Sequence, residues 1–578
     1  MTRTAVYLFT VLWISSSGAQ LNGYDEIFDE KGEVRPHYAA IYQAWESIPE
    51  KKRNELFENS KKAFEGDNYL EILPRILTSA EFYGVVKPGI EQRAQAIRAF
   101  LMDHYSGSKN YARDHIVPES VVTRAMSKTT ELGHFGKLDP SRIAFMYGPD
   151  LIRDENGNWR VIEDNPGYLG GLGDLDLAYK YLAKSYPELK KIKHKNPEEF
   201  YKGLTDVFKN RADLHDGRVV MYMSRHSSDN EDPRLRDIFV KHGVMFVTPK
   251  SQTQLKISKD AVYVFDTKKG FEASKEKVGF IFINGEHDGI DPSYFEVQKK
   301  LIREEALSQL EEMEDDREGY EELIEKIKKV LFSPNKKTGE IDYKKLLRLI
   351  AQSDIEADFE SELRASRGAR GLIKAILEGK VESSYSPGVD FIGDKEFYIY
   401  VPELIRYYLQ EEVILQNIPT QSFADPKTGK LRKKEFAEVF RDLKGHVIKP
   451  TDGRGGDGIF IGPYMTKEDA KRSQKLVKSD PEGFIHQSLM TMSHLRNLIV
   501  DLRGYAFVDG LGVWVGDHMF SRGLPMDRDK KGKLKGNGKV NLSDQGRELL
   551  VLVSEGGVKF SCSSLFKFKP TNRKMAHP

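Results

Sequence analysis

The sequence predicts an α+β protein of several domains, and three observations support that prediction. Short apolar runs that are separated by tight turns indicate strands, among them the runs on either side of the turn at 154–157. A Gly-rich segment within 446–462 joins two further short strands. From 304 to 378, apolar residues recur at intervals of three and four among many charged residues, which is typical of helices. Together these patterns favour a mixed protein with sheets and a helical insertion.

Length and composition agree with this fold class. The chain has 578 residues, and 39% hydrophobic residues can fill a substantial core. A chain of this length holds roughly two to four domains. The 89 Lys and Arg residues are balanced by 88 Asp and Glu residues, so we expect no nucleic-acid partner and no general membrane-binding surface.

A hairpin at 150–165 places oxygen ligands at its open end. Asp150 closes one apolar run, and the return run delivers Glu163, Asp164 and Asn165. Because side chains alternate along a strand, Glu163 and Asn165 should face one side and Asp164 the other. Two carboxylates and an amide oxygen suit Mg²⁺, which often shares its coordination shell with nucleotide phosphates. The hairpin therefore predicts a metal site at Asp150, Glu163 and Asn165, although acids and amides are also common on solvated strand ends.

The Gly-rich segment predicts a loop that binds phosphate. A short buried strand ends at Lys449, and the glycines that follow lead into the next strand. The loop glycines are Gly453, Gly455, Gly456 and Gly458. Glycines let backbone N–H groups approach an anion, and a lysine at the loop mouth adds a positive charge. A Gly-rich hairpin without a ligand is the alternative.

Two common nucleotide loops do not fit this segment. A Walker loop would need Gly-Lys-Ser/Thr, and a dinucleotide fingerprint would need a helix after the glycines. Here the loop joins a strand to a strand.

Further motifs surround the loop in a characteristic order. Lys395 follows Asp394 upstream, and 483–489 resembles a strand and hinge beside an adenine, with Gln487 as a hydrogen-bonding residue. The C-terminal half then contributes Arg503, Arg522 and Asn541. This order resembles the ATP-grasp fold with its last element, the acidic hairpin, moved to the front. Glu163 follows Asp150 by 13 residues, which fits the family's spacing of these ligands.

The chain is therefore similar to the circularly permuted ATP-grasp proteins of type 2, which are related in fold to glutathione synthetase and glutathionylspermidine synthetase. The resemblance covers about residues 24–186 and 370–546. Within these ranges, further sequence motifs of the family are matched at 24–38, 73–76, 92–101 and 400–409. It implies a circularly permuted ATP-grasp core with a small α/β domain on the acceptor side, to which the helical pattern at 304–378 adds a helical insertion.

The same resemblance implies an ATP-dependent carboxylate–amine ligase. In this reaction a carboxylate takes the terminal phosphoryl group of ATP, and an amine then displaces phosphate from the acyl phosphate, so that ADP and phosphate are released. The cofactors implied are ATP and Mg²⁺, with the metal on Asp150, Glu163 and Asn165. The implied nucleotide-binding residues are Lys395, Lys449, Gly453, Gly455, Gly456, Gly458 and Gln487.

The resemblance also assigns catalytic roles to Arg503, Arg522 and Asn541. The two guanidinium groups would stabilise charge on the transferred phosphoryl group and on the tetrahedral intermediate. A structural interpretation stands beside this one, since Asp501 and Arg503 lie two residues apart on an expected strand and could form an ion pair. Three arginines of the N-terminal part could bind a substrate carboxylate or anchor helices, and they receive no catalytic role. They are Arg35, Arg75 and Arg93.

The first 19 residues predict a secretory signal peptide. Arg3 precedes an apolar run at 5–14, and the small residues Ser17 and Ala19 precede a cut before Gln20. The apolar run is too short for a stable membrane anchor. We expect an exported protein, periplasmic or secreted, or a cytoplasmic one if the extension is not processed. A buried N-terminal helix or a misassigned start is the alternative.

The expected organisation has five segments. After the signal peptide at 1–19 come an N-terminal part with the metal-binding hairpin at 20–186, a small α/β domain at 187–300, a helical insert at 301–380 and a nucleotide-binding part at 381–578. The α/β domain should contain strands near 218–223, 243–247 and 279–283 and a helix at 234–242.

Two other functions compete with the ligase. An exported, catalytically degenerate member of the family could bind a nucleotide or a peptide without turnover, although the intact candidate site argues for activity. The protein could also transfer a phosphoryl or nucleotidyl group to a protein acceptor. For the ligase, the expected partners are ATP, an unidentified carboxylate and an amine acceptor such as an amino acid, a peptide or a polyamine.

Overall fold

The computed structural model describes residues 23–64, 69–128, 138–167, 169–185, 194–223, 231–248, 251–284, 291, 302–303, 305–310, 313, 319–332, 341–350, 352, 369–452, 458–526 and 546–554. The expected signal peptide lies outside these residues. Among these residues, none of the helices combines the length and the apolar character that a membrane span requires. Helices and sheets are both extensive, which confirms the α+β class.

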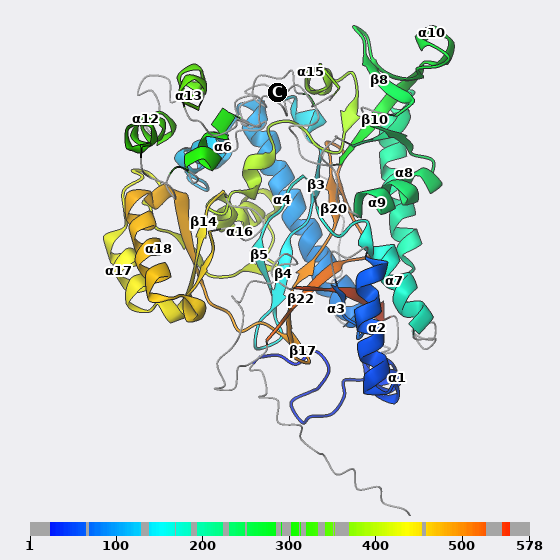
Figure 1. Cartoon of the computed structure of the whole chain (residues 1–578), viewed down its shortest axis with the longest axis vertical. Coiled ribbons are helices and arrows are strands. Elements are labelled where there is room, and N and C mark those ends of the chain that lie inside the picture. Colours follow the sequence, from blue (N-terminus) through cyan, green and yellow to red (C-terminus); the bar gives the residue numbers. More distant parts are fainter. Residues whose placement is uncertain are drawn as a thin grey trace, which may run out of the picture.

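A ten-stranded sheet forms the centre of the described chain, and its strands come from both ends of the sequence (Figure 1). Its main order is β1 (Tyr69–Leu70), β23 (Arg547–Ser554), β22 (Phe520–Pro525), β19 (Leu502–Arg503), β4 (Asp150–Arg153), β5 (Trp159–Glu163) and β12 (Gln416–Asn417). β2 (Arg75–Thr78) pairs with β23, and β18 (Leu498–Val500) joins β17 (His494–Leu495) to β22. The acidic hairpin β4–β5 therefore lies between two strands of the C-terminal half.

Helix α4 (Lys87–Ser106) packs along the largest core. Its buried residues Ile90, Ala94, Ile97 and Leu101 recur at intervals of four and three, so they form one apolar face. A π-helical turn, η1 (Phe82–Val86), precedes the helix, and Gly107 ends it in the left-handed conformation that favours glycine. The apolar face packs against a three-stranded sheet of β3 (Phe145–Tyr147), β20 (Ala506–Val508) and β21 (Val513–Val515).

A six-stranded sheet carries the predicted small α/β unit. The strands β6 (Arg218–Met223), β7 (Met245–Val247) and β10 (Glu276–Asn284) and the helix α9 (Glu231–Lys241) lie near their expected positions. Helix α8 (Pro197–Asp213) covers β6 and β10. Three strands of this sheet escaped the sequence analysis, namely β8 (Thr253–Ile257), β9 (Val262–Asp266) and β11 (Glu382–Ser383).

A smaller lobe holds a four-stranded sheet in the order β13 (Thr420–Ser422), β16 (Phe484–Ser488), β14 (His446–Pro450) and β15 (Phe460–Ile461). Helices α17 (Lys433–Arg441) and α18 (Lys467–Ser479) cover one face of this sheet, on the left in Figure 1. The Gly-rich segment connects β14 to β15, which pair as antiparallel strands. The strand-to-strand connection is thus confirmed.

The remaining helices surround these sheets. They are α1 (Ala39–Ser47), α2 (Glu50–Ala63), α3 (Ser79–Glu81), α5 (Asn110–Arg113), α6 (Glu119–Lys128), α7 (Asp174–Ser185), α10 (Phe271–Ser274), α12 (Glu321–Phe332), α13 (Tyr343–Ile350), α15 (Leu372–Leu377) and α16 (Val401–Leu404). α12 and α13 belong to the expected helical insert and share a small core of their own. The five predicted segment boundaries stay predictions.

Candidate active site

The acidic hairpin and the C-terminal half of the chain meet at Asp150. In the central sheet Asp150 lies opposite Glu163 on β5 and opposite Arg503 on β19. Residues that face each other in antiparallel strands project to the same side of the sheet. The sheet therefore brings two predicted metal ligands and a predicted catalytic arginine to one place.

Two arginines hold the Asp150 carboxylate. Arg503 donates to both oxygens, with Nε 2.6 Å from Oδ1 and Nη2 2.8 Å from Oδ2. Arg522 donates from Nη2 to Oδ2 at 2.9 Å. Burial alone would raise the pKa of Asp150, but the two guanidinium groups outweigh it and hold the pKa well below its usual range. Asp150 is therefore ionised at neutral pH, as a metal ligand must be.

Asp501 fixes Arg522 from the other side. Its carboxylate accepts hydrogen bonds from Nε and from the backbone N–H of Arg522, both at 2.9 Å. Asp501 is buried, and burial raises its pKa even though Arg522 acts in the opposite direction. The alternative interpretation, an ion pair between Asp501 and Arg503, is wrong, because each of these residues pairs with a different partner. The sequence placed acids and arginines on neighbouring strands but did not fix which faces which.

Both predicted lysines reach the same region. Lys395 Nζ lies 3.7 Å from the Glu163 carboxylate, and its backbone N–H donates to the Thr451 carbonyl at 2.8 Å. Lys449 is the penultimate residue of strand β14 and is buried. Burial, with Lys395 nearby, lowers the pKa of Lys449 to about 8, although Glu163 and Asp150 favour its charged form. Two ammonium groups therefore face two carboxylates across the junction of the two sheets.

The four-stranded sheet presents one face to this junction. Lys449 and Val447 alternate with Ile448, whose side chain packs in the core under α17 and α18. Gln487 lies opposite Val447 in the sheet and so shares its face. Its Nε2 donates to the Ile162 carbonyl at 3.0 Å, so this side chain ties the smaller lobe directly to the acidic hairpin.

The structure confirms that Asp164 points away from Glu163, while the expected side of Asn165 stays a prediction. Asp164 is buried on the opposite side from Glu163, where Arg93 binds both of its oxygens at 2.7 and 2.8 Å and Tyr147 donates a further hydrogen bond at 2.6 Å. Asn165 donates from Nδ2 to the Gly148 carbonyl at 3.1 Å. That bond orients the Asn165 amide, and the amide oxygen is the atom that would coordinate a metal.

Several predicted site residues lie outside the described residues. They are Gly453, Gly455, Gly456 and Asn541. Gly458 is described and has a left-handed backbone, with φ of 66°, which glycine adopts without strain. Their roles in binding or catalysis stay predictions.

The three N-terminal arginines have structural partners. Arg93 forms the fully buried pair with Asp164. Arg75 is also fully buried and pairs with Glu26 at 2.5 Å, while it donates to the Asp501 carbonyl at 2.8 Å. Arg35 donates to the Asp25 carbonyl at 3.0 Å. These contacts support the anchoring interpretation of the three arginines.

The oxygen ligands at the hairpin fit a hard cation whose coordination shell is completed by ligands from outside the protein. No group of three or more His, Cys, Asp and Glu side chains within the described ranges could hold a metal alone. Asp150, Glu163 and Asn165 offer two carboxylates and an amide oxygen, and Mg²⁺ usually takes a few protein ligands together with phosphates and water. The N–H donors of Arg503 and Arg522 occupy three acceptor positions of Asp150, which leaves Oδ1 as the oxygen with spare capacity.

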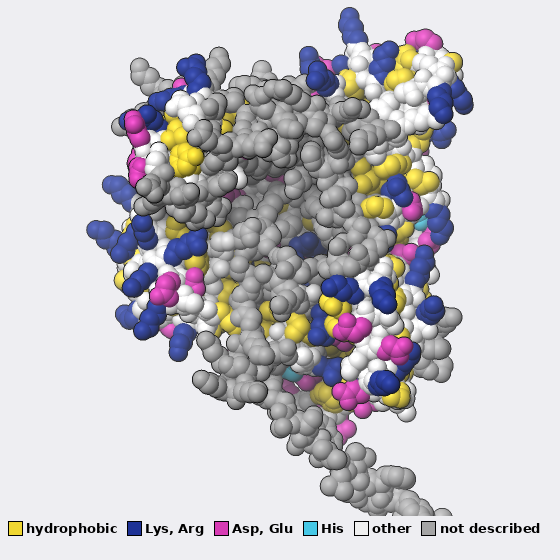
Figure 2. Space-filling view, in the orientation of Figure 1, with side chains coloured by type: hydrophobic (Ala, Val, Ile, Leu, Met, Phe, Trp, Pro, Cys, Tyr) yellow, Lys and Arg dark blue, Asp and Glu magenta, His cyan; other side chains and the backbone are white. Residues whose placement is uncertain are grey.

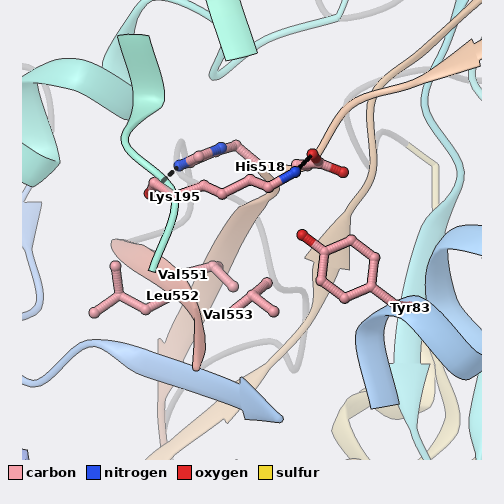
Figure 3. A pocket seen from close by; sticks show the side chains of 7 residues that line it. Tyr83, Lys195, His518, Val551, Leu552 and Val553 are labelled. Carbon is pink, nitrogen blue, oxygen red and sulfur yellow. Dashed lines mark hydrogen bonds and ion pairs between the residues drawn. The ribbon is translucent and has the colours of Figure 1, made fainter. Parts of the chain in front are cut away.

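A small polar cavity lies beside Asp517 and His518, which come just before strand β22. Figure 3 shows Lys195 and His518 above an apolar floor of Val551, Leu552 and Val553, with Tyr83 at one side. The side chains of Lys87 and Lys195 both pair with Asp517. The space between the lining residues is about 10 Å³, which is room for about one water molecule. None of the predicted site residues that the structure describes lines this cavity.

The chain is similar in sequence to several known proteins. A protein of Frankia alni, whose name assigns it provisionally as a glutamate–cysteine ligase, is 26% identical over 521 residues, which cover 84% of this chain and 49% of that protein. The chain thus spans about half the length of this relative. An uncharacterised protein of Synechocystis is 24% identical over 86% of this chain and 91% of its own length.

A solved structure is also similar. It is a glutathione synthetase-like effector from Globodera pallida in its apo form, with 7% identity, a TM-score of 0.44 and coverage of 88% of this chain and 98% of that one. The profile of the circularly permuted ATP-grasp type 2 family matches residues 74–235 and 343–522, which together exceed half of the chain. These matched ranges contain the acidic hairpin, both lysines and both arginines of the site, and we conclude that the chain belongs to the circularly permuted ATP-grasp type 2 family.

Proposed function

We propose that the protein is an ATP-dependent carboxylate–amine ligase that works through an acyl phosphate. The observation that supports this proposal best is the convergence at Asp150. Two carboxylates, two buried lysines and two arginines from distant parts of the chain surround one region at the junction of two sheets. Such a concentration of charge suits a reaction in which the protein must position and neutralise phosphate groups.

The nucleotide would lie between the smaller lobe and the acidic hairpin. Val447 and Ile461 face each other on the same side of the four-stranded sheet as Gln487, and both are half-buried. They offer an apolar surface for a purine, and Lys449 lies two residues from Val447 on the same face. Lys395 and Lys449 would then bind phosphate oxygens. Asp150, Glu163 and Asn165 would hold Mg²⁺, which neutralises phosphate charge when it is bound.

The two arginines would serve the reacting groups. A carboxylate oxygen of the first substrate attacks the terminal phosphorus of ATP, and the bond to the bridging oxygen breaks to release ADP. An amine then attacks the acyl carbon, phosphate leaves, and the amine loses a proton. Negative charge grows on the transferred phosphoryl group and on the tetrahedral intermediate. Arg503 and Arg522 are anchored through Asp150 and Asp501, so their charges are already oriented for these steps.

The first substrates to test follow from the relatives. The name of the Frankia protein points to glutamate as the carboxylate and cysteine as the amine. We propose this pair as the starting point, followed by other amino acids, short peptides and polyamines.

The test measures products after the protein is incubated with ATP, Mg²⁺ and candidate substrates. The ligase proposal expects ADP and phosphate in equal amounts and an amide product that mass spectrometry detects. Glu163→Gln should abolish the product, because it removes one carboxylate of the metal site. Glu155→Gln is the matched control, since Glu155 lies on the same hairpin at its exposed turn.

The same measurement separates the competing functions. AMP release, or transfer of label from ATP to a protein acceptor, would support a nucleotidyl or phosphoryl transferase. Nucleotide binding without any product in a broad substrate screen that includes cell extract would support a degenerate binding protein. Either result would overturn the ligase proposal.

A further inference from the structure

Helix α18 carries a row of four lysines on its outer surface. Lys467, Lys471, Lys475 and Lys478 are all exposed. Their spacing of four, four and three residues places them on one face of the helix. Ser473 and Val477, on the opposite side, are buried against the lobe. The row is therefore a continuous strip of positive charge that points away from the protein.

The strip is not neutralised by the protein itself. Among the described residues, no ion pair joins any of these four lysines to an acid, and Lys478 Nζ instead lies 5.3 Å from the centre of the Phe436 ring. The acids of α18, Glu468 and Asp469, are confined to its first turn, where Asp469 forms the capping box with Thr466. Like charges four residues apart destabilise a helix. The arrangement therefore costs stability unless an external anion compensates for it.

Neighbouring segments extend the positive surface. Helix α17 and the turn after it add exposed basic side chains, against two exposed acids, Glu438 and Asp442. The added basic residues are Lys433, Lys434, Arg441 and Lys444. Figure 2 shows Lys and Arg side chains outnumbering Asp and Glu on the lobe that carries α17 and α18. The whole chain has a net charge of only +1, so the excess is local.

We propose that the α18 lysine strip docks an acidic polypeptide in an extended conformation. Residues four apart on a helix are separated by about 6 Å along its axis. Alternate side chains of an extended strand are about 6.6 Å apart. A peptide with an acid at every second position can therefore place successive carboxylates against successive lysines. Charge complementarity of this kind supplies specificity and a fast association rate.

The composition of the surface favours a polypeptide over other polyanions. Proteins that bind single-stranded nucleic acids without sequence preference stack bases on aromatic side chains, and interfacial helices insert apolar side chains into lipid. Among the described residues, α17 and α18 carry no large hydrophobic side chain that is strongly exposed. The described part of this surface thus has positive charge but lacks exposed aromatic side chains for base stacking and large exposed apolar side chains for insertion into lipid.

The test is binding of a fluorescent peptide of alternating Glu and Ser to the full-length protein without ATP. The comparison variant replaces Lys467, Lys471, Lys475 and Lys478 with Gln. We expect this variant to bind about tenfold more weakly, because each exposed pair contributes modestly and four are lost. A matched control replaces four exposed lysines elsewhere, Lys51, Lys259, Lys268 and Lys269, and should bind within about twofold of the wild type. Circular dichroism confirms that both variants are folded.

Three outcomes would overturn the proposal. The first is equal binding of the peptide by the strip variant and the wild type, and the second is equal binding of a peptide with Gln in place of Glu. The third is tighter binding of a single-stranded oligonucleotide or of anionic lipid vesicles through the same four lysines, which would make the partner a nucleic acid or a membrane. Because ATP is absent, the result is independent of the ligase proposal.

Discussion

Arg503 donates hydrogen bonds of 2.6 and 2.8 Å to the two carboxylate oxygens of Asp150, which lies 353 positions earlier in the chain. The N-terminal strand β4 and the C-terminal strand β19 are therefore joined by an ion pair as well as by backbone pairing. Asp150→Asn should therefore weaken two properties together. The free energy of unfolding should fall by about 3 kcal/mol, because buried guanidinium groups lose a countercharge. Urea denaturation measures this loss, and the affinity for Mg²⁺-ATP, measured by calorimetry, should fall at least about tenfold. Unchanged affinity would remove Asp150 from the metal site.

Asp501→Asn tests whether Asp501 is a positioning residue for Arg522. The variant keeps the shape of the side chain but removes the charge that orients the guanidinium group. Under the ligase proposal we expect kcat to fall by about tenfold to a hundredfold with little change in KM for ATP. Asp501→Glu should recover part of the loss. A rise in KM with an unchanged kcat would contradict this role.

Lys449 should make nucleotide binding depend on pH. Burial lowers its pKa to about 8, so the fraction of charged lysine falls as the pH rises through that value. Phosphate binding needs the charged form, and affinity for ATP should therefore fall by up to about tenfold for each pH unit above 8. Lys449→Arg, which stays charged, should flatten the profile. Calorimetry from pH 7 to pH 10 measures both proteins.

The same pKa also predicts how stability without nucleotide varies with pH. The folded pKa of Lys449 lies below its unfolded value, so between about pH 8 and pH 10.5 the unfolded chain binds more protons than the folded one. Over this range Lys449 should make the free energy of unfolding increase with pH. Lys449→Met should remove this contribution, and urea denaturation at several pH values would detect the difference. A steeper dependence in the variant would contradict the assignment.

Arg93 and Asp164 should matter for folding and not for chemistry. Both side chains are completely buried, so Arg93→Met leaves the Asp164 carboxylate without its main countercharge. We expect the free energy of unfolding to fall by about 3 to 5 kcal/mol. Adding Asp164→Asn to Arg93→Met should restore part of the stability, since it removes the uncompensated charge. Urea denaturation of the three variants tests this coupling, and strictly additive losses would argue against a direct pair.

Local patterns in the sequence predicted features that depend on near neighbours. The alternation of β5, which ends at Glu163, predicted that the next residue, Asp164, points the other way, because side-chain direction follows from strand geometry. The connection between β14 and β15 was likewise visible, since Val447 and Phe460 belong to short apolar runs on either side of the glycines. Family resemblance supplied the wider fold, and the family match confirms it.

Features that depend on the register between distant strands could not be predicted from the sequence. Asp501 faces Arg522 and Arg503 faces Asp150 because three strands align in one particular register, which no local pattern specifies. The strand β23 also escaped the sequence analysis. It is a continuous apolar run between β1 and β22, buried on both faces, and therefore shows no alternation. The β8–β9 hairpin, at the edge of its sheet, was missed as well.

The position of β4–β5 between β12 and β19 has a consequence for biosynthesis. The acidic hairpin leaves the ribosome long before the strands that flank it have been translated. Until Arg503 and Arg522 emerge, the Asp150 carboxylate has neither guanidinium partner and can stay hydrated. A nascent chain or a truncated product that ends before β19 thus cannot assemble the Asp150 cluster, so under the ligase proposal ATP turnover would begin only after nearly the entire polypeptide has been made.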